Sequence, residues 1–180
     1  MKKLYLILPL ALILCFMVGC QDKEAMAELE EFKAQAEVEQ QNKALVLQWY
    51  EELGKGNIEK GFEVCAPDYR LYFPSNTGTP LTKEQNLEIA LQTFQAFPDT
   101  VHEIKDIVAV DDKVIVRGVD IATHTQEFQG FPPTGKKLEV SWLIIFRFEE
   151  GKIVEAWEEF DSLGWMQQLG MELKPKEEEK

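Results

Sequence analysis

The spacing of apolar residues changes once along this chain, and that change limits the folds it can adopt. Up to Phe97, apolar side chains recur every three or four residues, which is the spacing of helices with one buried face. From Val101 onward they alternate with polar residues, as in strands with one buried face. Helices followed by a run of strands predict an α+β domain, in which a curved antiparallel sheet wraps around helices and forms a cone with an internal pocket.

Local signals place the individual elements. Residues 46–53 carry a helical apolar stripe, Asn57 can cap a second helix, and a capping box begins a third helix at Thr82. Strands are expected at 69–73, 101–110, 113–128, 137–148 and 153–160, and a short helix at 162–169.

The first 19 residues have the pattern of a bacterial lipoprotein signal peptide. Lys2 and Lys3 precede an uncharged apolar run that ends at Val18, and Cys20 follows shortly after it. This run is shorter than the roughly 20 residues of a membrane-spanning helix. We therefore expect lipidation at Cys20, with palmitate among the acyl chains, and attachment to the membrane at the extracytoplasmic face of the cell envelope. An uncleaved anchor or a plain secretory signal is the alternative.

The remaining chain divides by composition into three parts. Residues 20–41 are rich in Glu, Ala, Gln and Lys and predict a helical tether, with a partner-binding amphipathic helix as the alternative. Residues 42–170 form the cone domain, and residues 171–180 a disordered acidic tail. With Cys20 lipidated, Cys65 is the one free thiol of the mature chain, and its apolar neighbours predict a core residue rather than a nucleophile.

Charge and residue spacing exclude several classes of partner. A formal net charge of −13 argues against binding to nucleic acid, whose phosphates require a basic surface. The two His and three Cys show none of the spacings of a metal site. We expect neither a metal nor another cofactor.

The last strand carries the strongest candidates for a site. With strict alternation, Ile153, Glu155, Trp157, Glu159 and Asp161 share one face. If that face lines an apolar pocket, Trp157 is part of its wall and Asp161 is a carboxylate whose pKa is raised by desolvation and by Glu159, as a proton shuttle requires. Asp161 is equally well placed to be only the N-cap of the following helix.

Further candidates lie on the other elements. Trp142 and Phe146 share an apolar strand face suited to a core or a pocket wall, and Tyr50 belongs to the helical stripe that would cover it. His124 shares a strand face with Asp120 and could polarise a carbonyl group, although an ordinary surface position is the alternative. His102 is expected to be solvated.

From Asp112 onward the sequence resembles the SnoaL-like polyketide cyclase (ester cyclase) family, within the cystatin-like superfamily that includes nuclear transport factor two. The segments that carry the resemblance are 116–117, 122–128, 130–136, 145–148, 151–157 and 160–170. The resemblance implies a cone with a deep pocket, commonly in a homodimer, and a last-strand Asp as the acid/base for an intramolecular aldol closure without a metal. Asp161 matches that Asp and His124 a common family His, whereas Ala122 and Gln126 stand where Gly is usual.

Together these features predict a lipid-anchored domain that binds a small hydrophobic ligand. The expected chemistry is acid/base cyclisation, isomerisation or hydration through Asp161. The alternatives are a non-catalytic module for ligand binding or envelope interactions, and a purely structural dimer.

Overall fold

The structure, a computed structural model, describes residues 4–75, 78–172 and 174, with side chains described from Lys23 onward. The chain divides into two compact units, Met1–Val38 and Glu39–Lys180. The side chain of Cys20 and most of the expected tail lie outside the described residues. The predicted cleavage, lipidation and disorder of these segments therefore stay predictions.

Helix α1 (Leu4–Gly54) joins two segments that the sequence suggested as separate helices, the tether and the stripe at 46–53. In its last turns Val46, Trp49 and Leu53 are buried, because their spacing places them on the face that meets the sheet. Among the residues whose side chains are described, from Lys23 onward, no helix is both long enough and apolar enough to cross a membrane.

Three shorter helices and a 3₁₀ turn complete the helical part. They are α2 (Ile58–Gly61), η1 (Phe62–Val64), α3 (Lys83–Ala96) and α4 (Ser162–Leu169). The capping box of α3 is confirmed, since the Thr82 hydroxyl accepts from the Gln85 N–H at 3.3 Å and the Gln85 side chain accepts from the Thr82 N–H at 2.9 Å. Asn57 does not cap α2, because its side-chain amide donates to Glu52 at 2.8 Å instead.

Six strands form one open sheet in the order β2-β1-β6-β5-β4-β3. Their bounds are β1 (Cys65–Tyr72), β2 (Leu81–Thr82), β3 (Val101–Val110), β4 (Lys113–Thr123), β5 (Lys137–Glu149) and β6 (Lys152–Phe160). The predicted α+β class is confirmed. The sheet is mixed rather than wholly antiparallel, because β1 pairs in parallel with β6.

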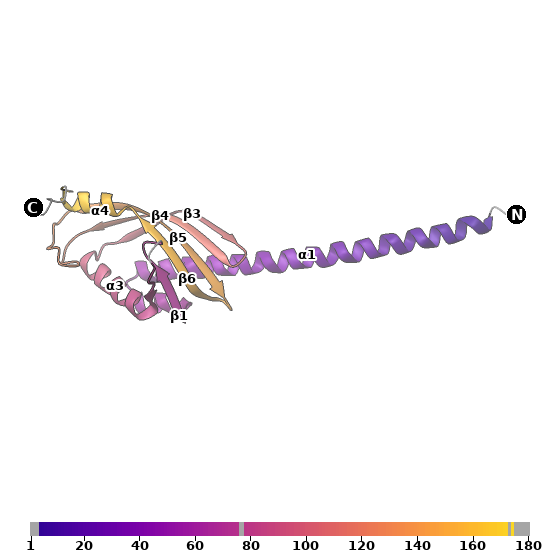
Figure 1. Cartoon of the computed structure of the whole chain (residues 1–180), viewed down its shortest axis with the longest axis horizontal. Coiled ribbons are helices and arrows are strands. Elements are labelled where there is room, and N and C mark those ends of the chain that lie inside the picture. Colours follow the sequence, from indigo (N-terminus) through magenta and orange to yellow (C-terminus); the bar gives the residue numbers. More distant parts are fainter. Residues whose placement is uncertain (1–3, 76–77, 173, 175–180) are drawn as a thin grey trace, which may run out of the picture. The chain divides into compact units, whose positions relative to one another are not determined.

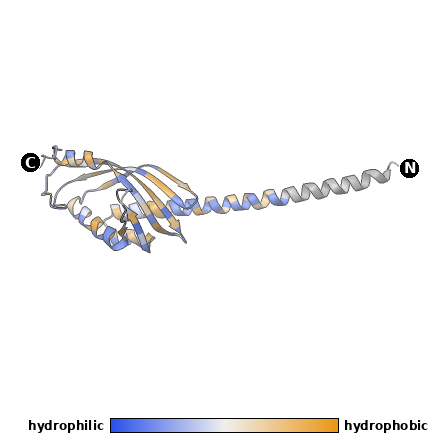
Figure 2. Cartoon of the chain, in the orientation of Figure 1, coloured by the Kyte–Doolittle hydropathy of each residue, from blue (hydrophilic) through white to orange (hydrophobic). Residues whose placement is uncertain are grey.

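The core lies between the concave side of the sheet and the helices. Helix α3 and the C-terminal part of α1 lie on the same side of β3–β6 (Figure 1). Figure 2 shows apolar and polar residues alternating along these strands, which gives each strand one buried face. Val114, Val116, Phe146, Ile153 and Ala156 on that face are fully buried.

Two β-bulges change which residues face the helices. The register of β3 with β4 shifts between Ile104 and Asp106, so that Lys105 is the extra residue. The register of β6 with β5 shifts between Ile153 and Glu155, so that Val154 is the extra residue. Because side chains alternate with a period of two, each shift reverses the facing of every residue beyond it.

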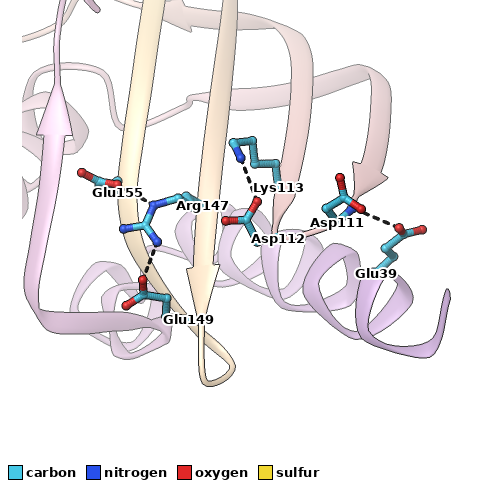
Figure 3. A network of polar contacts seen from close by, with 7 residues as sticks. All are labelled: Glu39, Asp111, Asp112, Lys113, Arg147, Glu149 and Glu155. Carbon is cyan, nitrogen blue, oxygen red and sulfur yellow. Dashed lines mark hydrogen bonds and ion pairs between the residues drawn. The ribbon is translucent and has the colours of Figure 1, made fainter. Parts of the chain in front are cut away.

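The hairpin ends of the sheet carry a network of charged side chains (Figure 3). Arg147 on β5 forms two ion pairs: its Nε lies 2.5 Å from Glu155 Oε2 on β6, and its Nη1 lies 2.6 Å from Glu149 Oε1. In the β3–β4 turn, the Asp111 N–H donates to the Glu39 carboxylate of α1 at 3.0 Å. The Arg147–Glu155 pair lies just beyond the β6 bulge, on the outer face of the sheet, and supports the shifted register.

Candidate functional site

A cavity of about 320 Å³ lies between the sheet and α3, at the end of the strands opposite the charged network of Figure 3. A second compartment of about 130 Å³ lies deeper, against α1. The two compartments adjoin, because they share six lining residues. These are Asn86, Ala90, His102, Asp120, Trp142 and Glu158.

Glu158 is one of two carboxylates at this junction, together with Asp120. It follows the β6 bulge, which places it with Ala156 and Phe160 on the inner face of the sheet. Burial raises the pKa of its carboxyl group to about 7, and the negative charges of Asp120 and Glu159 act in the same direction. At neutral pH the group is therefore present in both its protonated and its ionised form.

His102 and Asp120 form a hydrogen-bonded pair beside Glu158. The bulge at Lys105 turns His102 inward, directly opposite Asp120 on β4. His102 Nδ1 lies 2.8 Å from Asp120 Oδ1, and the His102 side chain is 10% exposed. Its Nε2 is buried and has no hydrogen-bond partner among the described residues.

Trp142 fixes the position of Asp120 from the neighbouring strand. Its indole N–H donates to Asp120 Oδ1 at 2.6 Å. The indole ring lies against Gly118, where an added Cβ would overlap it. Gly118 is thus required for the close approach of the ring, and the glycine positions Trp142 and, through it, Asp120.

Aromatic rings form much of the remaining wall. The ring of Tyr50 on α1 stacks on that of Trp142, with a centroid distance of 5.3 Å, and packs against the ring of His102 at a centroid distance of 5.4 Å. The ring of Phe94 on α3 also packs against that of His102, with centroids 5.7 Å apart. Burial raises the pKa of Tyr50 well above its usual value, and the charges of Glu158 and Asp120 add to this effect. The Tyr50 phenol is therefore neutral at any physiological pH.

The lining disfavours an anionic ligand. Among the described residues that border the two compartments there is no Lys or Arg, whereas Asp120 and Glu158 are acidic. A ligand carboxylate or phosphate would meet these acids without a positive partner. The described residues also contain no cluster of three or more His, Cys, Asp and Glu side chains that could hold a metal ion.

The outer face of β6 carries the residues that strict alternation placed in the pocket. Trp157 stacks on Tyr72 at 5.7 Å, and the exposed Glu159 accepts hydrogen bonds from Ser75. Asp161 is exposed and caps α4, accepting from the Gly164 N–H at 2.8 Å. The expectation that Trp157, Glu159 and Asp161 line the cavity is wrong, because the bulge at Val154 turns them to the other face.

His124 and Phe146 are buried but line neither compartment. His124 stacks on Phe97 at 4.9 Å, and its Nδ1 lies 3.3 Å from the Thr134 N–H group. Phe146 is fully buried in the main core, and the centroid of its ring lies 5.0 Å from that of Trp49. Of the residues expected at the site, the structure thus places Trp142 at the junction and Tyr50 on the deeper compartment. The catalytic roles of Asp161 and His124 stay predictions without a cavity contact.

Glu158 and His102, which sequence reasoning did not select, are brought to the cavity by the two bulges. Nothing in the residues around Lys105 or Val154 marks an extra position in the strand. Asp120 did carry a signal, because it shares the inward face of β4 with Val114, Val116 and Gly118.

The comparisons with known proteins agree with this architecture. The family model of the SnoaL-like polyketide cyclases matches residues 44–169. No similar sequence is found among curated proteins.

Solved structures resemble the same part of the chain. IdmH, a putative polyketide cyclase from Streptomyces antibioticus, is 33% identical with a TM-score of 0.63, over 72% of this chain and 99% of its own. AclR, a putative hydroxylase from Streptomyces galilaeus, is 28% identical with a TM-score of 0.68, and the match covers 73% of this chain and 97% of AclR. A putative SnoaL-like polyketide cyclase from Jannaschia shares the fold. It is 24% identical with a TM-score of 0.67, and the match covers 75% of this chain and 95% of that protein. The chain therefore belongs to the SnoaL-like polyketide cyclase family.

Proposed function

We propose that this chain binds a small, neutral, largely apolar carbonyl compound in its cavity and transfers a proton on it through Glu158. Suitable reactions are an intramolecular aldol cyclisation or an isomerisation next to the carbonyl group. The observation that carries the proposal is the position of Glu158, a half-buried carboxyl group at the junction of both compartments with a pKa of about 7.

The physical reason lies in the match between this pKa and the pH of a cell or its envelope. A proton-transfer group works best when its pKa is close to the operating pH, because it can then both give and take the proton. The aromatic walls keep the surroundings of the carboxyl group apolar, which is also what raises its pKa.

The substrate class follows from the lining and gains support from the relatives. The wall offers aromatic faces and no cation, which suits a neutral molecule with rings or an extended apolar chain. Several solved relatives are described as polyketide cyclases, and polyketides are carbonyl-rich molecules of this kind. We therefore propose an enolisable ketone or ester as the substrate.

The exchange of α-protons of 2-tetralone for deuterium in D₂O, followed by proton NMR, tests this function. The ketone is apolar, bicyclic and enolisable, and exchange reports proton transfer without requiring the natural substrate. Glu158→Gln should lower the protein-dependent rate by about 10²-fold or more, since Gln cannot transfer the proton. Asp161→Asn is the matched control on the same strand end and should leave the rate unchanged.

Two outcomes would count against the proposal. Exchange that is lost in Asp161→Asn but kept in Glu158→Gln would return the catalytic role to the outer face of β6. Binding of 2-tetralone by the wild-type chain without any exchange would support a non-catalytic binding module instead.

We further propose that the domain is attached to a membrane by lipid on Cys20. The basis is the sequence before it, with two lysines, an uncharged apolar run and a cysteine directly after Gly19. Metabolic labelling with an alkyne fatty acid should mark the wild-type chain and not Cys20→Ser, whereas Cys65→Ser should label normally. Equal labelling of wild type and Cys20→Ser would refute the assignment.

A further inference from the structure

The hydrogen bonds around Asp120 determine which nitrogen of His102 carries a proton. The indole N–H of Trp142 can only donate, so Asp120 Oδ1 acts as an acceptor at 2.6 Å. The same oxygen lies 2.8 Å from His102 Nδ1. An ionised Asp120 can only accept, so His102 Nδ1 is the donor and carries the proton.

The other ring nitrogen, His102 Nε2, is consequently a lone-pair acceptor when the ring is neutral. It is buried and has no hydrogen-bond partner among the described residues, while the residue itself borders both compartments. An unpaired buried polar atom is costly and requires an explanation. A ligand group that gives a proton to Nε2 supplies one.

The second histidine of the chain provides an internal comparison. At His124, Nδ1 lies 3.3 Å from both the backbone N–H and the hydroxyl oxygen of Thr134; the N–H can only donate, so Nδ1 is the acceptor and the proton resides on Nε2. His124 Nε2 is also buried without a hydrogen-bond partner among the described residues, so it is the contact with the cavity that distinguishes His102. His124 lines neither compartment and stacks on Phe97. The two buried histidines are thus expected in opposite tautomers, and only His102 presents a basic nitrogen beside the cavity.

We propose that His102, oriented by Asp120, is the base that removes a proton from the carbon next to the carbonyl group of the bound ligand, while protonated Glu158 acts as the acid. This assignment rests on the proposed function. In the step, the C–H bond breaks, its proton bonds to His102 Nε2, and its electron pair forms the C=C bond of an enol. The carbonyl oxygen takes the proton of Glu158, which leaves an imidazolium and a carboxylate.

The charges around His102 suit this division of roles. The titratable groups that border the compartments with it are Tyr50 of α1, Tyr69 of β1, Asp120 of β4 and Glu158 of β6. Both tyrosines are neutral, since burial raises their pKa values well above the usual range. The imidazolium formed in the step therefore lies beside the Asp120 carboxylate and the newly ionised Glu158, and both stabilise it.

The tautomers can be read directly by ¹⁵N NMR of the full chain with labelled histidine, because the chain contains only two histidines. We expect His102 as the Nδ1–H form and His124 as the Nε2–H form. Addition of 2-naphthol, whose hydroxyl group mimics the enol, should shift the Nε2 resonance of His102 and leave that of His124 in place. An Nε2–H tautomer at His102 would overturn the proposal.

Deuterium exchange of 2-tetralone separates this inference from the proposed function. His102→Gln should reduce the exchange by about 10²-fold, while the affinity for 2-naphthol changes only a few-fold. Asp120→Asn, which keeps a hydrogen-bonding side chain but not the charge, should show a smaller loss. Full exchange in His102→Gln together with loss in Glu158→Gln would refute the role of His102 alone. An absence of exchange in the wild type would refute both.

Discussion

The half-buried carboxyl group of Glu158 should make the stability of the fold depend on pH in a defined way. Its pKa in the folded chain is about 7, against an ordinary value of 4.5. The difference corresponds to about 3 kcal/mol, at roughly 1.4 kcal/mol per pH unit. Replacement by Gln keeps the size of the side chain and removes its charge, so a comparison of the two chains isolates this contribution.

The sign of the effect follows from which state binds more protons. Below pH 4.5 Glu158 is protonated in both the folded and the unfolded chain, and Glu158→Gln should differ little from wild type. Between pH 4.5 and about 7 the folded chain retains the proton that the unfolded chain has lost, so the wild-type stability falls relative to the variant. Above about pH 7 the variant should be more stable by about 3 kcal/mol.

Urea denaturation of the full chain at intervals between pH 4 and 8.5 measures this difference. Glu139→Gln is the matched control, because Glu139 is exposed on the outer face of β5. The difference between wild type and Glu139→Gln should show no comparable step. A flat difference between wild type and Glu158→Gln, or a step in the opposite direction, would refute the placement of Glu158 in an apolar cavity.

Four substitutions and one thiol reagent probe other parts of the structure. Gly118→Ala should destabilise the fold by about 1–3 kcal/mol in urea denaturation and change the Trp142 fluorescence, because the added methyl group overlaps the indole ring. Phe146→Ala should cost about 3–5 kcal/mol, as expected for a fully buried core ring, and unchanged stability would contradict its burial. Asp161→Ala should cost about 0.5–2 kcal/mol through loss of the α4 cap, and Asp161→Asn much less. Cys65 should react with a thiol reagent only on unfolding, because burial raises its pKa to about 12.

Much of the fold could be predicted from the sequence, because the elements follow from local patterns. The change from helical to alternating spacing located β3 to β6 within a few residues, and the Thr82 capping box marked the start of α3. The parallel pairing of β1 with β6 could not be predicted, because it joins segments far apart in the chain and depends on tertiary packing.

The site was predicted less well than the fold, for a physical reason. A β-bulge adds one residue to a strand without a clear sequence signal, and it reverses the facing of everything beyond it. Strict alternation was right for β4 and β5, which pair without a shift and present Asp120 and Trp142 to the cavity. It was misleading for β6, where Val154 is the extra residue and Glu158 rather than Asp161 faces inward.

Contacts between the full chain and bound 2-naphthol, measured as intermolecular NOEs by isotope-filtered NMR, test the position of the site most directly. Binding between the sheet and α3 should give NOEs from the ligand to Phe94 and Trp142 and none to Trp157. NOEs to Trp157, or a ligand that contacts neither Phe94 nor Trp142, would show that the cavity around Glu158 is not the binding site.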